Sequence, residues 1–162
     1  MWMRRFLALC ALGVVGLAPA CGHEASAGTQ SASDRAAVRG LESRFHQAMT
    51  SKDLNQMMSL WTNAAVLTAG GKSHRGIEEI RSYFAETAPV FKLQNNWIVL
   101  TAGWRIDAAV KGDNGTLYFE CYFIDRLTKT VKAASGAHAT VVRSSGRWLI
   151  SSLVSRPITL GS

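Results

Sequence analysis

The side chains best suited to acid–base and nucleophilic chemistry in this chain are its four histidines and three cysteines. His138 and Thr140 share one face of a predicted strand. An imidazole that faces a pocket there could act as a general base. The alternative is a hydrogen-bonded polar residue that lines a core or pocket, which is the more common role. His138 is therefore a candidate acid or base with a structural alternative beside it.

The remaining histidines and Cys121 have weaker claims to chemistry. His46 is expected on an exposed helix face and His74 in a loop. Cys121 falls on the apolar face of a predicted strand, where we expect an inert buried thiol. Because no spacing of His, Cys, Asp and Glu matches a metal site, we expect neither a metal nor another cofactor.

A carboxylate between two tyrosines is a further candidate. Glu120 is flanked at a spacing of two by Tyr118 and Tyr122, so all three share one strand face. A carboxylate in such surroundings either has a shifted pKa or lies in an interface. Since the opposite face carries Phe119 and Cys121 and suits the core, we expect the three polar residues to face outward, toward a dimer partner.

The first residues of the chain predict export. Arg4 and Arg5 precede an uncharged apolar stretch at residues 6–17. That stretch is shorter than the roughly 20 residues that a membrane-spanning helix needs. These features are typical of a signal peptide, which we place at residues 1–20.

Cys21 directly follows this segment, and Ala18-Pro19-Ala20 before it resembles the lipobox of bacterial lipoprotein precursors. A lipid on Cys21 would anchor the protein in the bacterial cell envelope, in the periplasm or at the cell surface. The alternative is ordinary cleavage after small residues, followed by secretion. The Ser-, Ala- and Gly-rich residues 21–33 are predicted to form a flexible tether.

Charge argues against one class of partner. The formal net charge is +7, but the basic residues are dispersed and form no run that interleaves with aromatics. Nucleic-acid binding requires a basic patch or stripe. We therefore expect no nucleic-acid partner.

Residues 34–160 carry the patterns of one folded domain, with helices first. Val38, Leu41 and Phe45 share one face of a helix. Asp53 is a plausible N-cap of a second short helix, whose apolar face we extend to Trp61. Beyond Pro89 the apolar period becomes two, which predicts strands. Strands are predicted within residues 65–69, 97–110, 116–127, 131–143 and 147–155, and a third helix follows Gly76. Helices followed by a meandering sheet indicate an α+β architecture.

Three segments of this domain are similar to the NTF2-like superfamily, in its SnoaL-like branch. They are residues 44–54 (RFHQAMTSKDL), 75–84 (RGIEEIRSYF) and 146–150 (GRWLI). The resemblance implies a cystatin-like cone, in which N-terminal helices pack on a strongly curved, mainly antiparallel sheet that encloses a pocket open at one end. It also implies a homodimer formed through the outer face of the sheet.

The same resemblance implies that the steroid-isomerase catalytic set is missing. Members of that kind use an Asp base, with a Tyr and a protonated Asp as hydrogen-bond donors. Aligned with the family, Phe45 takes the place of the Tyr, Ala69 the place of the base, and His138 the place of the second acid. Two of the three functions are therefore absent.

Two hypotheses about function remain. The first is an exported, membrane-anchored domain that binds a small apolar ligand or a partner protein without catalysis. The alternative is a SnoaL-like small-molecule enzyme, an isomerase, dehydratase or hydrolase, that uses His138 as acid or base. In either case the predicted ligand pocket is lined by Phe45, Trp61, Ala69, His138 and Thr140.

Overall fold

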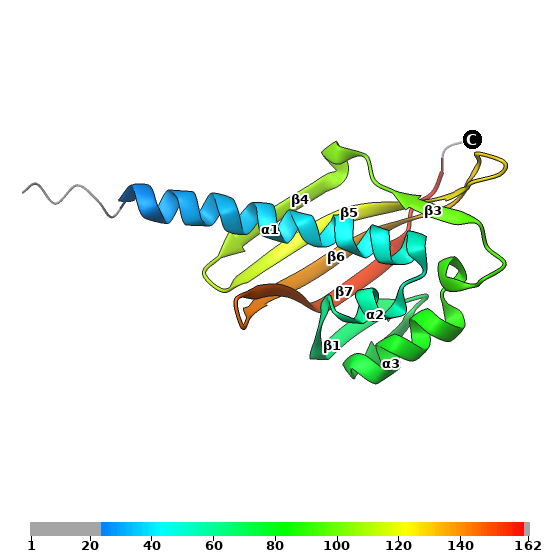
Figure 1. The fold of residues 1–162 in the computed structure, drawn as a ribbon, viewed down its shortest axis with the longest axis horizontal. Helices are drawn as coiled ribbons and strands as arrows, with labels where there is room; N and C mark the ends of the chain where they lie inside the picture. The colour runs from blue at the N-terminus through cyan, green and yellow to red at the C-terminus, as the bar shows by residue number, and fades with distance from the viewer. Residues whose placement is uncertain (1–23, 161–162) are drawn as a thin grey trace, which may run out of the picture.

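The structure is a computed structural model that describes the backbone of residues 24–160 and, apart from residues 24–29 and Trp104, their side chains (Figure 1). The predicted signal peptide and Cys21 lie outside the described residues. Within residues 24–160 no helix is both long enough and apolar enough to cross a membrane.

The first helix, α1 (Glu24–Ser51), has 28 residues and lies along the sheet (Figure 1). Its predicted apolar stripe is confirmed, because Val38, Leu41 and Phe45 are all buried. At a rise of about 1.5 Å per residue, such a helix extends for roughly 40 Å. Its C-terminal half can therefore reach across the sheet while its first turns project beyond it.

The tether predicted for residues 21–33 requires a correction, because α1 already begins at Glu24. Several of these residues are alanines, which have the highest helix propensity. Because α1 is anchored further along by tertiary packing, it can extend through these residues without a new nucleation step. The domain boundary drawn at Asp34 instead marks the first buried residue after the exposed residues 30–33.

The second helix, α2 (Leu54–Met58), begins after Asp53, whose side chain accepts a hydrogen bond from the backbone N–H of Gln56 at 2.8 Å, as an N-cap does. Trp61 does not belong to this helix, which corrects the sequence expectation. It is the first residue of β1 and is buried. In a five-residue helix the apolar period could not show where the helix ended.

The rest of the chain forms a seven-stranded sheet with α3 against β1 (Figure 1). The strand order is β2-β1-β7-β6-β5-β3, with β4 also paired to β5. All pairs are antiparallel except β1 with β7. The strands are β1 (Trp61–Ala69), β2 (Lys72–Arg75), β3 (Trp97–Leu100), β4 (Ile106–Lys111), β5 (Asn114–Asp125), β6 (Val131–Ser144) and β7 (Arg147–Pro157). The remaining helical elements are α3 (Gly76–Ser82), the π-helical turn η1 (Tyr83–Thr87) and the 3₁₀ turns η2 (Pro89–Phe91) and η3 (Gly103–Arg105).

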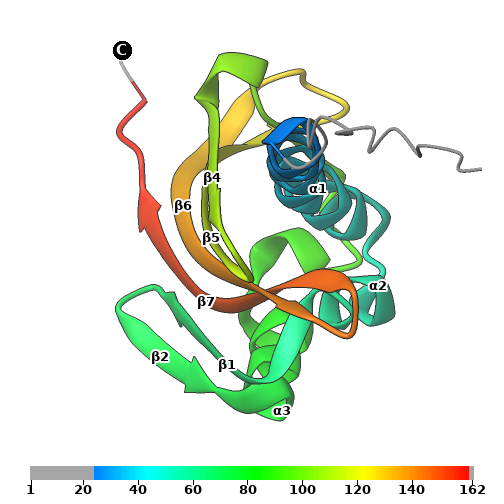
Figure 2. The ribbon, with the colours of Figure 1, turned by 90° about the vertical axis from the view of Figure 1, so that its left-hand side faces the viewer.

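The sheet bends around α1, as the end-on view in Figure 2 shows. Register shifts interrupt the β5–β6 ladder near Phe123 and the β6–β7 ladder near Thr140, and such bulges bend strands. The inner face of β5 presents Leu117, Phe119 and Cys121 to α1, and all three are buried. The predicted α+β architecture of helices on a curved, mainly antiparallel sheet is confirmed.

Candidate functional site

A cavity of about 80 Å³ lies between α1, the turns η1 and η2, and the inner face of the sheet. Phe45 and Met49 of α1 form one wall, and Tyr83 and Phe84 of η1 form another. A π-helical turn is rare in proteins and often occurs at functional sites. The cavity therefore lies where the sheet, the long helix and an irregular segment converge.

Aromatic rings make this wall stiff. Phe45 packs edge-on against Phe84 at a centroid distance of 6.1 Å and against Phe119 at 5.4 Å. Trp61 lies 6.3 Å from Phe45 and 6.2 Å from Phe84. Each such pair contributes about 0.5–1.5 kcal/mol beyond the burial of its surface. The rings are thus held in place before any ligand enters.

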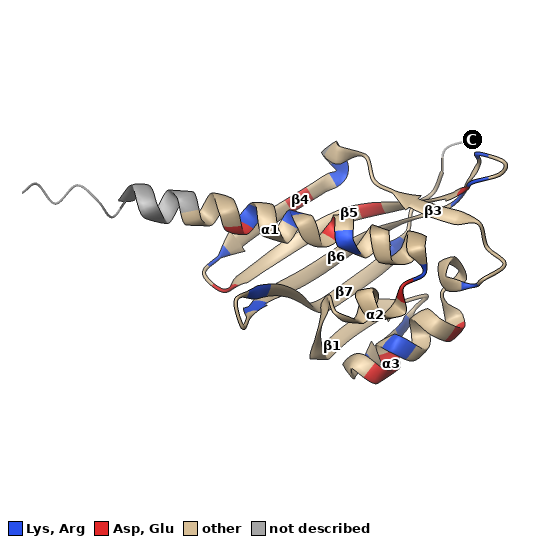
Figure 3. Cartoon of the chain, in the orientation of Figure 1, with Lys and Arg blue, Asp and Glu red and all other residues tan. Residues whose placement is uncertain are grey.

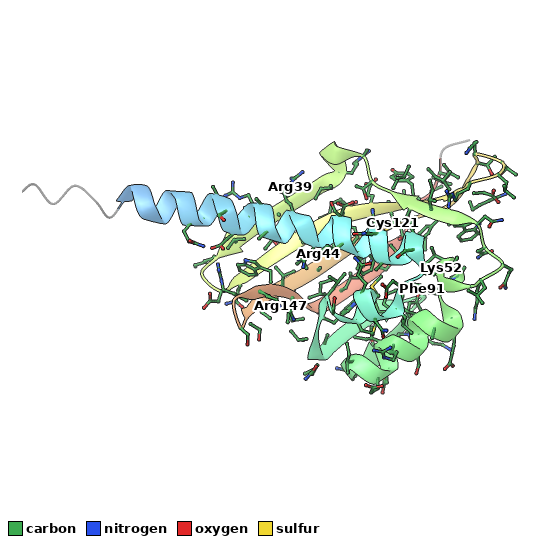
Figure 4. All side chains as sticks on the ribbon, viewed as in Figure 1. Arg39, Arg44, Lys52, Phe91, Cys121 and Arg147 are labelled. Atoms are coloured by element: carbon green, nitrogen blue, oxygen red, sulfur yellow. The ribbon has the colours of Figure 1, made fainter. Side chains whose placement is uncertain are left out.

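Lys52, just beyond the end of α1, holds the segment that borders the cavity. Its Nζ donates hydrogen bonds to the backbone oxygens of Val90 at 2.6 Å and Lys92 at 2.9 Å. Figure 4 shows Lys52 beside Phe91 at this end of the helix. Burial lowers the pKa of Lys52, since no carboxylate accompanies the ammonium group in these contacts. The contacts tie η2 to α1.

The structure divides the five residues of the predicted pocket. Phe45 and Ala69 line the cavity, and Trp61 lies behind its aromatic wall. His138 and Thr140, in contrast, are exposed on the outer face of β6. These five side chains therefore belong to two different surfaces rather than to one pocket.

The misplacement of His138 has a simple geometric cause. Successive side chains of a strand point to opposite faces, so an error of one residue in register moves a side chain from one face to the other. Ala137 and Ala139 are buried on the inner face, and Ala137 lines the cavity. No fixed motif lies between position 138 and the family-like segment at residues 146–150, so the sequence does not determine this register. The side chain that reaches the cavity is therefore the methyl group of Ala137 and not the imidazole of His138.

On the outer face, His138 lies in a groove of about 600 Å³ that is more open to solvent than the cavity. Its ring packs on that of Tyr118 at a centroid distance of 4.6 Å. Asp107 and Ser152 also line this groove. A catalytic role for His138 stays a prediction, and the inner cavity is not where it would act.

A polar cluster that the sequence did not predict lies beside the cavity and consists of Glu42, His46 and Cys121. His46 Nδ1 lies 2.9 Å from Glu42 Oε1, and His46 Nε2 lies 3.1 Å from Cys121 Sγ. The exposed fractions are 6% for Glu42, 6% for His46 and 3% for Cys121. Cys121 itself lines the cavity. Figure 4 shows Cys121 beside α1, the helix that carries the other two residues.

The expectation that His46 lies on an exposed helix face is therefore wrong. A single apolar stripe predicts one buried face, but the curved sheet covers a second face of α1, where β3 and β5 contact the helix. A signal was present in the sequence, since Glu42 and His46 are four residues apart and such pairs meet on a helix surface. Their convergence on Cys121, 75 residues away along the chain, was not visible there.

The electrostatics of the cluster follow from its burial. Burial alone would raise the pKa of Glu42, but the hydrogen bond and charge of His46 lower it below its ordinary value. Burial raises the pKa of the Cys121 thiol, which is therefore neutral at rest. With Glu42 ionised, His46 Nδ1 carries the proton that it donates to the carboxylate. His46 Nε2 is then free to accept the S–H of Cys121.

A fourth residue, Thr101, contacts the same histidine. Thr101 Oγ1 lies 3.1 Å from His46 Nδ1 and donates a hydrogen bond to the backbone oxygen of Glu120. The polar atoms run in sequence from carboxylate to imidazole to thiol and do not converge on one point. Accordingly, residues 24–160 contain no group of three or more His, Cys, Asp or Glu side chains that could hold a metal ion.

The outer face of β5 carries a second buried carboxylate. Glu120 is 4% exposed and accepts hydrogen bonds from Tyr118 Oη at 2.9 Å and Tyr122 Oη at 2.6 Å. Arg105 Nη1 lies 3.6 Å from Glu120 Oε1. The Tyr122 hydrogen bond, against burial, lowers the pKa of Glu120, and that same bond raises the pKa of Tyr122. The outward direction predicted for these three residues is confirmed; a dimer partner there stays a prediction.

Charged side chains elsewhere are scattered over helices, strands and turns (Figure 3). This distribution agrees with the dispersed charge seen in the sequence. None of the side chains that line the cavity is charged, within the part of the chain that the structure describes.

The sequence profile of the SnoaL-like domain matches residues 30–154, which is most of the chain. The chain is a member of the SnoaL-like domain family. No curated protein shows a significant match to this SnoaL-like protein. Its fold is nevertheless shared with many solved structures.

Three solved structures illustrate how widely the fold of this SnoaL-like protein is used. An NTF2-like protein with a cystatin-like fold from Novosphingobium aromaticivorans has a TM-score of 0.73 at 16% identity, and covers 85% of this chain and 92% of its own. A proposed dehydratase of the NTF2-like family from Streptomyces avermitilis has a TM-score of 0.66 at 17% identity, with coverages of 80% and 99%. A proposed ketosteroid isomerase from Shewanella frigidimarina has a TM-score of 0.59 at 15% identity, with coverages of 74% and 94%. At such identities the likeness shows the fold alone, and the predicted NTF2-like cone is confirmed.

Two positions that the family resemblance assigned to catalysis do face the cavity of this SnoaL-like protein. Phe45 lacks the hydroxyl of a tyrosine, and Ala69 lacks any proton acceptor. The third position is occupied at the cavity by Ala137 rather than His138. The chemistry that this cavity can support therefore depends on Cys121 and the residues behind it.

Proposed function

We propose that this SnoaL-like protein binds a small, uncharged and largely apolar molecule in the cavity beside α1. The observation that carries the proposal is the cavity's lining, which is aromatic and aliphatic except for the polar atoms of Tyr83, Cys121, Ser135 and Ser155. Apolar walls with a few placed polar groups are the general pattern of small-molecule sites.

The size of the cavity restricts the ligand. At about 80 Å³ it is well below typical ligand pockets, which measure about 300–1,000 Å³. A compact molecule, or one end of a larger molecule, is therefore the expected occupant. A charged ligand is disfavoured because a buried charge needs a partner, and no charged side chain among the described residues lines the cavity.

The proposal includes a place of action. The N-terminal sequence supports export and anchoring in the bacterial envelope through a lipid on Cys21, with secretion as the alternative. The pairing of two copies through the outer face of the sheet is supported by the cluster of Glu120 with Tyr118 and Tyr122. Native mass spectrometry of protein from the membrane fraction tests both, because it reads the lipid and the dimer mass together.

Ligand binding is tested with fluorobenzene, a compact apolar probe whose ¹⁹F resonance broadens and shifts on binding. The variant Ala137→Leu places a larger side chain in the cavity, and we expect it to weaken fluorobenzene binding about tenfold or more, as expected for an occluded apolar pocket. Ala36→Leu, at an exposed position of α1, is the matched control. Absence of binding to the unmodified protein, or equal binding by Ala137→Leu, contradicts the proposal.

The alternative function, an enzyme with His138 as acid or base, is less well supported. His138 lies in the open outer groove, against the ring of Tyr118. Tyr118 Oη is already engaged with Glu120. A reaction at His138 would therefore take place in solvent, on the face that we assign to the second copy.

A further inference from the structure

The Glu42–His46–Cys121 cluster is more than the packing of the cavity requires. An aliphatic side chain at each of these positions would fill a core without burying polar groups, which destabilise the fold when their hydrogen-bond partners are lost. Instead, an imidazole with both nitrogens engaged joins a carboxylate to a thiol. The thiol is the member that lines the cavity.

The arrangement matches the general requirement for an activated nucleophile. Such a group has a base within hydrogen-bond reach, and a third group orients the base. Here Cys121 Sγ lies 3.1 Å from His46 Nε2, and Glu42 Oε1 lies 2.9 Å from Nδ1 on the other side of the ring. The carboxylate thereby holds the tautomer that leaves Nε2 unprotonated, toward the thiol.

We propose that Cys121 is a nucleophile for a small apolar ester bound in this cavity, with His46 as its general base and Glu42 as the residue that positions His46. The proposal rests on the proposed function, because it uses the same cavity. It deepens that function by naming the class of ligand, a compact uncharged acyl ester, and by adding hydrolysis to binding.

The reaction uses only the ester and water. Cys121 Sγ attacks the carbonyl carbon while its proton passes to His46 Nε2, and an S–C bond forms as the C–O bond to the alcohol breaks. His46 returns the proton to the departing alkoxide, which leaves as the alcohol. Water then attacks the thioester carbonyl, again losing a proton to His46. The acid departs as the S–C bond breaks, and the sulfur recovers its proton.

The neutral state of the thiol agrees with this sequence of proton transfers. Burial raises the pKa of Cys121, so a resting thiolate is disfavoured. The thiolate forms only together with the attack, when His46 takes the proton and Glu42 stabilises the resulting imidazolium. General-base catalysis of this kind typically contributes about 10²–10⁴-fold in rate.

A hydroxyl near Cys121 can stabilise the negative charge that develops on the carbonyl oxygen. Ser135 is the direct partner of Cys121 in the β5–β6 ladder and lines the same cavity. Side chains opposite each other in an antiparallel ladder have Cβ atoms about 4.5–5.5 Å apart. A carbonyl group held against Cys121 Sγ is therefore within reach of the Ser135 hydroxyl.

The test uses p-nitrophenyl acetate and the full chain carrying Cys10→Ser and Cys21→Ser, so that Cys121 is the remaining thiol. Release of p-nitrophenol is followed by absorbance, and the acetylated residue is located by peptide mass spectrometry. We expect acetylation of Cys121 in the folded protein, followed by turnover, and loss of both in Cys121→Ser. Folded protein that carries no acetyl group on Cys121 overturns the proposal, whatever the behaviour of any variant.

The role of His46 is tested by His46→Gln, with Arg44→Gln on the same helix as the matched control. We expect His46→Gln to lower the maximal rate by about 100-fold or more, with little change in the ester concentration that gives half of that rate. Equal Cys121 acetylation in both variants, or acetylation of the urea-unfolded chain as fast as that of the folded chain, contradicts the proposal. Circular dichroism shows whether each variant is folded.

Glu42 acts through His46, and Glu42→Gln is expected to lower the maximal rate while leaving fluorobenzene binding unchanged. A purely structural role would weaken binding and rate together. This pair of measurements also separates the two proposals. Fluorobenzene binding without acetylation of Cys121 refutes the nucleophile alone, whereas loss of fluorobenzene binding refutes the ligand site.

Discussion

Two neighbouring residues of β5, Glu120 and Cys121, each anchor a polar cluster, but on opposite faces of the sheet. Cys121 points inward to His46 and Glu42 beside a cavity, while Glu120 points outward to two tyrosines and Arg105. Both are almost fully buried. The difference lies in what each cluster faces, since the inner one borders the cavity beside α1 and the outer one borders the outer surface of the sheet.

The two clusters contain similar polar groups but differ in the chemistry that they can perform. In the inner cluster an imidazole can both accept and donate a proton, and the sulfur next to it touches the cavity. In the outer cluster the carboxylate only accepts hydrogen bonds from phenols, whose pKa values are raised. Proton transfer is accordingly available on the inner face, whereas the outer carboxylate holds the two phenols in place.

The largest expected effect comes from emptying the inner wall. Phe45→Ala removes a ring that packs against three other aromatic side chains, and should lower the free energy of unfolding by about 3–5 kcal/mol. The enlarged cavity should at the same time bind 1-fluoronaphthalene more tightly than the cavity of the unmodified protein does. Urea unfolding and ¹⁹F NMR check the two parts. A loss below about 1 kcal/mol would mean that the wall is not a packed unit.

The next effect compares the two histidines. If the inner face carries the chemistry, His46→Gln loses p-nitrophenyl acetate hydrolysis by about 100-fold, and His138→Gln, which alters only the outer groove, does not reduce it. The opposite pattern would assign the chemistry to the outer face and support the alternative enzyme. Initial rates at equal folded concentration decide between the two.

Acid should weaken both clusters, in a direction that follows from their pKa values. The pKa values of Glu120 and Glu42 are lower in the folded protein than the ordinary value of 4.5. Their stabilisation is therefore fully present above that value and is lost as pH falls through the folded pKa. Tyr122→Phe removes the hydrogen bond that is the main cause of the lowered pKa of Glu120. It should therefore lower Tm at neutral pH and flatten the fall of Tm in acid. A fall as steep as in the unmodified protein would show that Glu120 does not contribute.

The smallest effect concerns the segment that borders the cavity. Lys52→Met removes two hydrogen bonds to backbone oxygens of residues 90 and 92. We expect the free energy of unfolding to fall by about 1–2 kcal/mol at most. Hydrogen exchange should accelerate more in η1 and η2 than in β5. Lys129→Met, in an exposed turn, is the matched control. Unchanged exchange at residues 83–92 would contradict a restraining role for Lys52.

Patterns that depend on neighbouring residues were predicted well. The stripe of Val38, Leu41 and Phe45 identified the buried face of α1, and alternation along β5 separated Glu120 from Cys121. Both depend on helix and strand periods that local sequence determines. Trp61, at the junction of α2 and β1, was misassigned because a single turn of helix is too short to show a period.

Patterns that depend on distant residues were not predicted. The curvature of the sheet brings β3 and β5 against a second face of α1, which buries His46. The register of β6 decided that Ala137, and not His138, reaches the cavity. Neither fact is local, since both depend on how strands pair and bend across many residues.

The sequence by itself therefore determined the α+β class, the buried stripe of α1 and the two faces of β5. Only the tertiary structure decided which polar groups meet. Glu42, His46 and Cys121 come together because a bent sheet closes over a long helix. The spacing of Glu42 and His46 indicates their contact, but nothing local indicates that Cys121, 75 residues from His46, joins them. The site is a product of sheet curvature and strand register, whereas the elements that carry it are products of local residue preference.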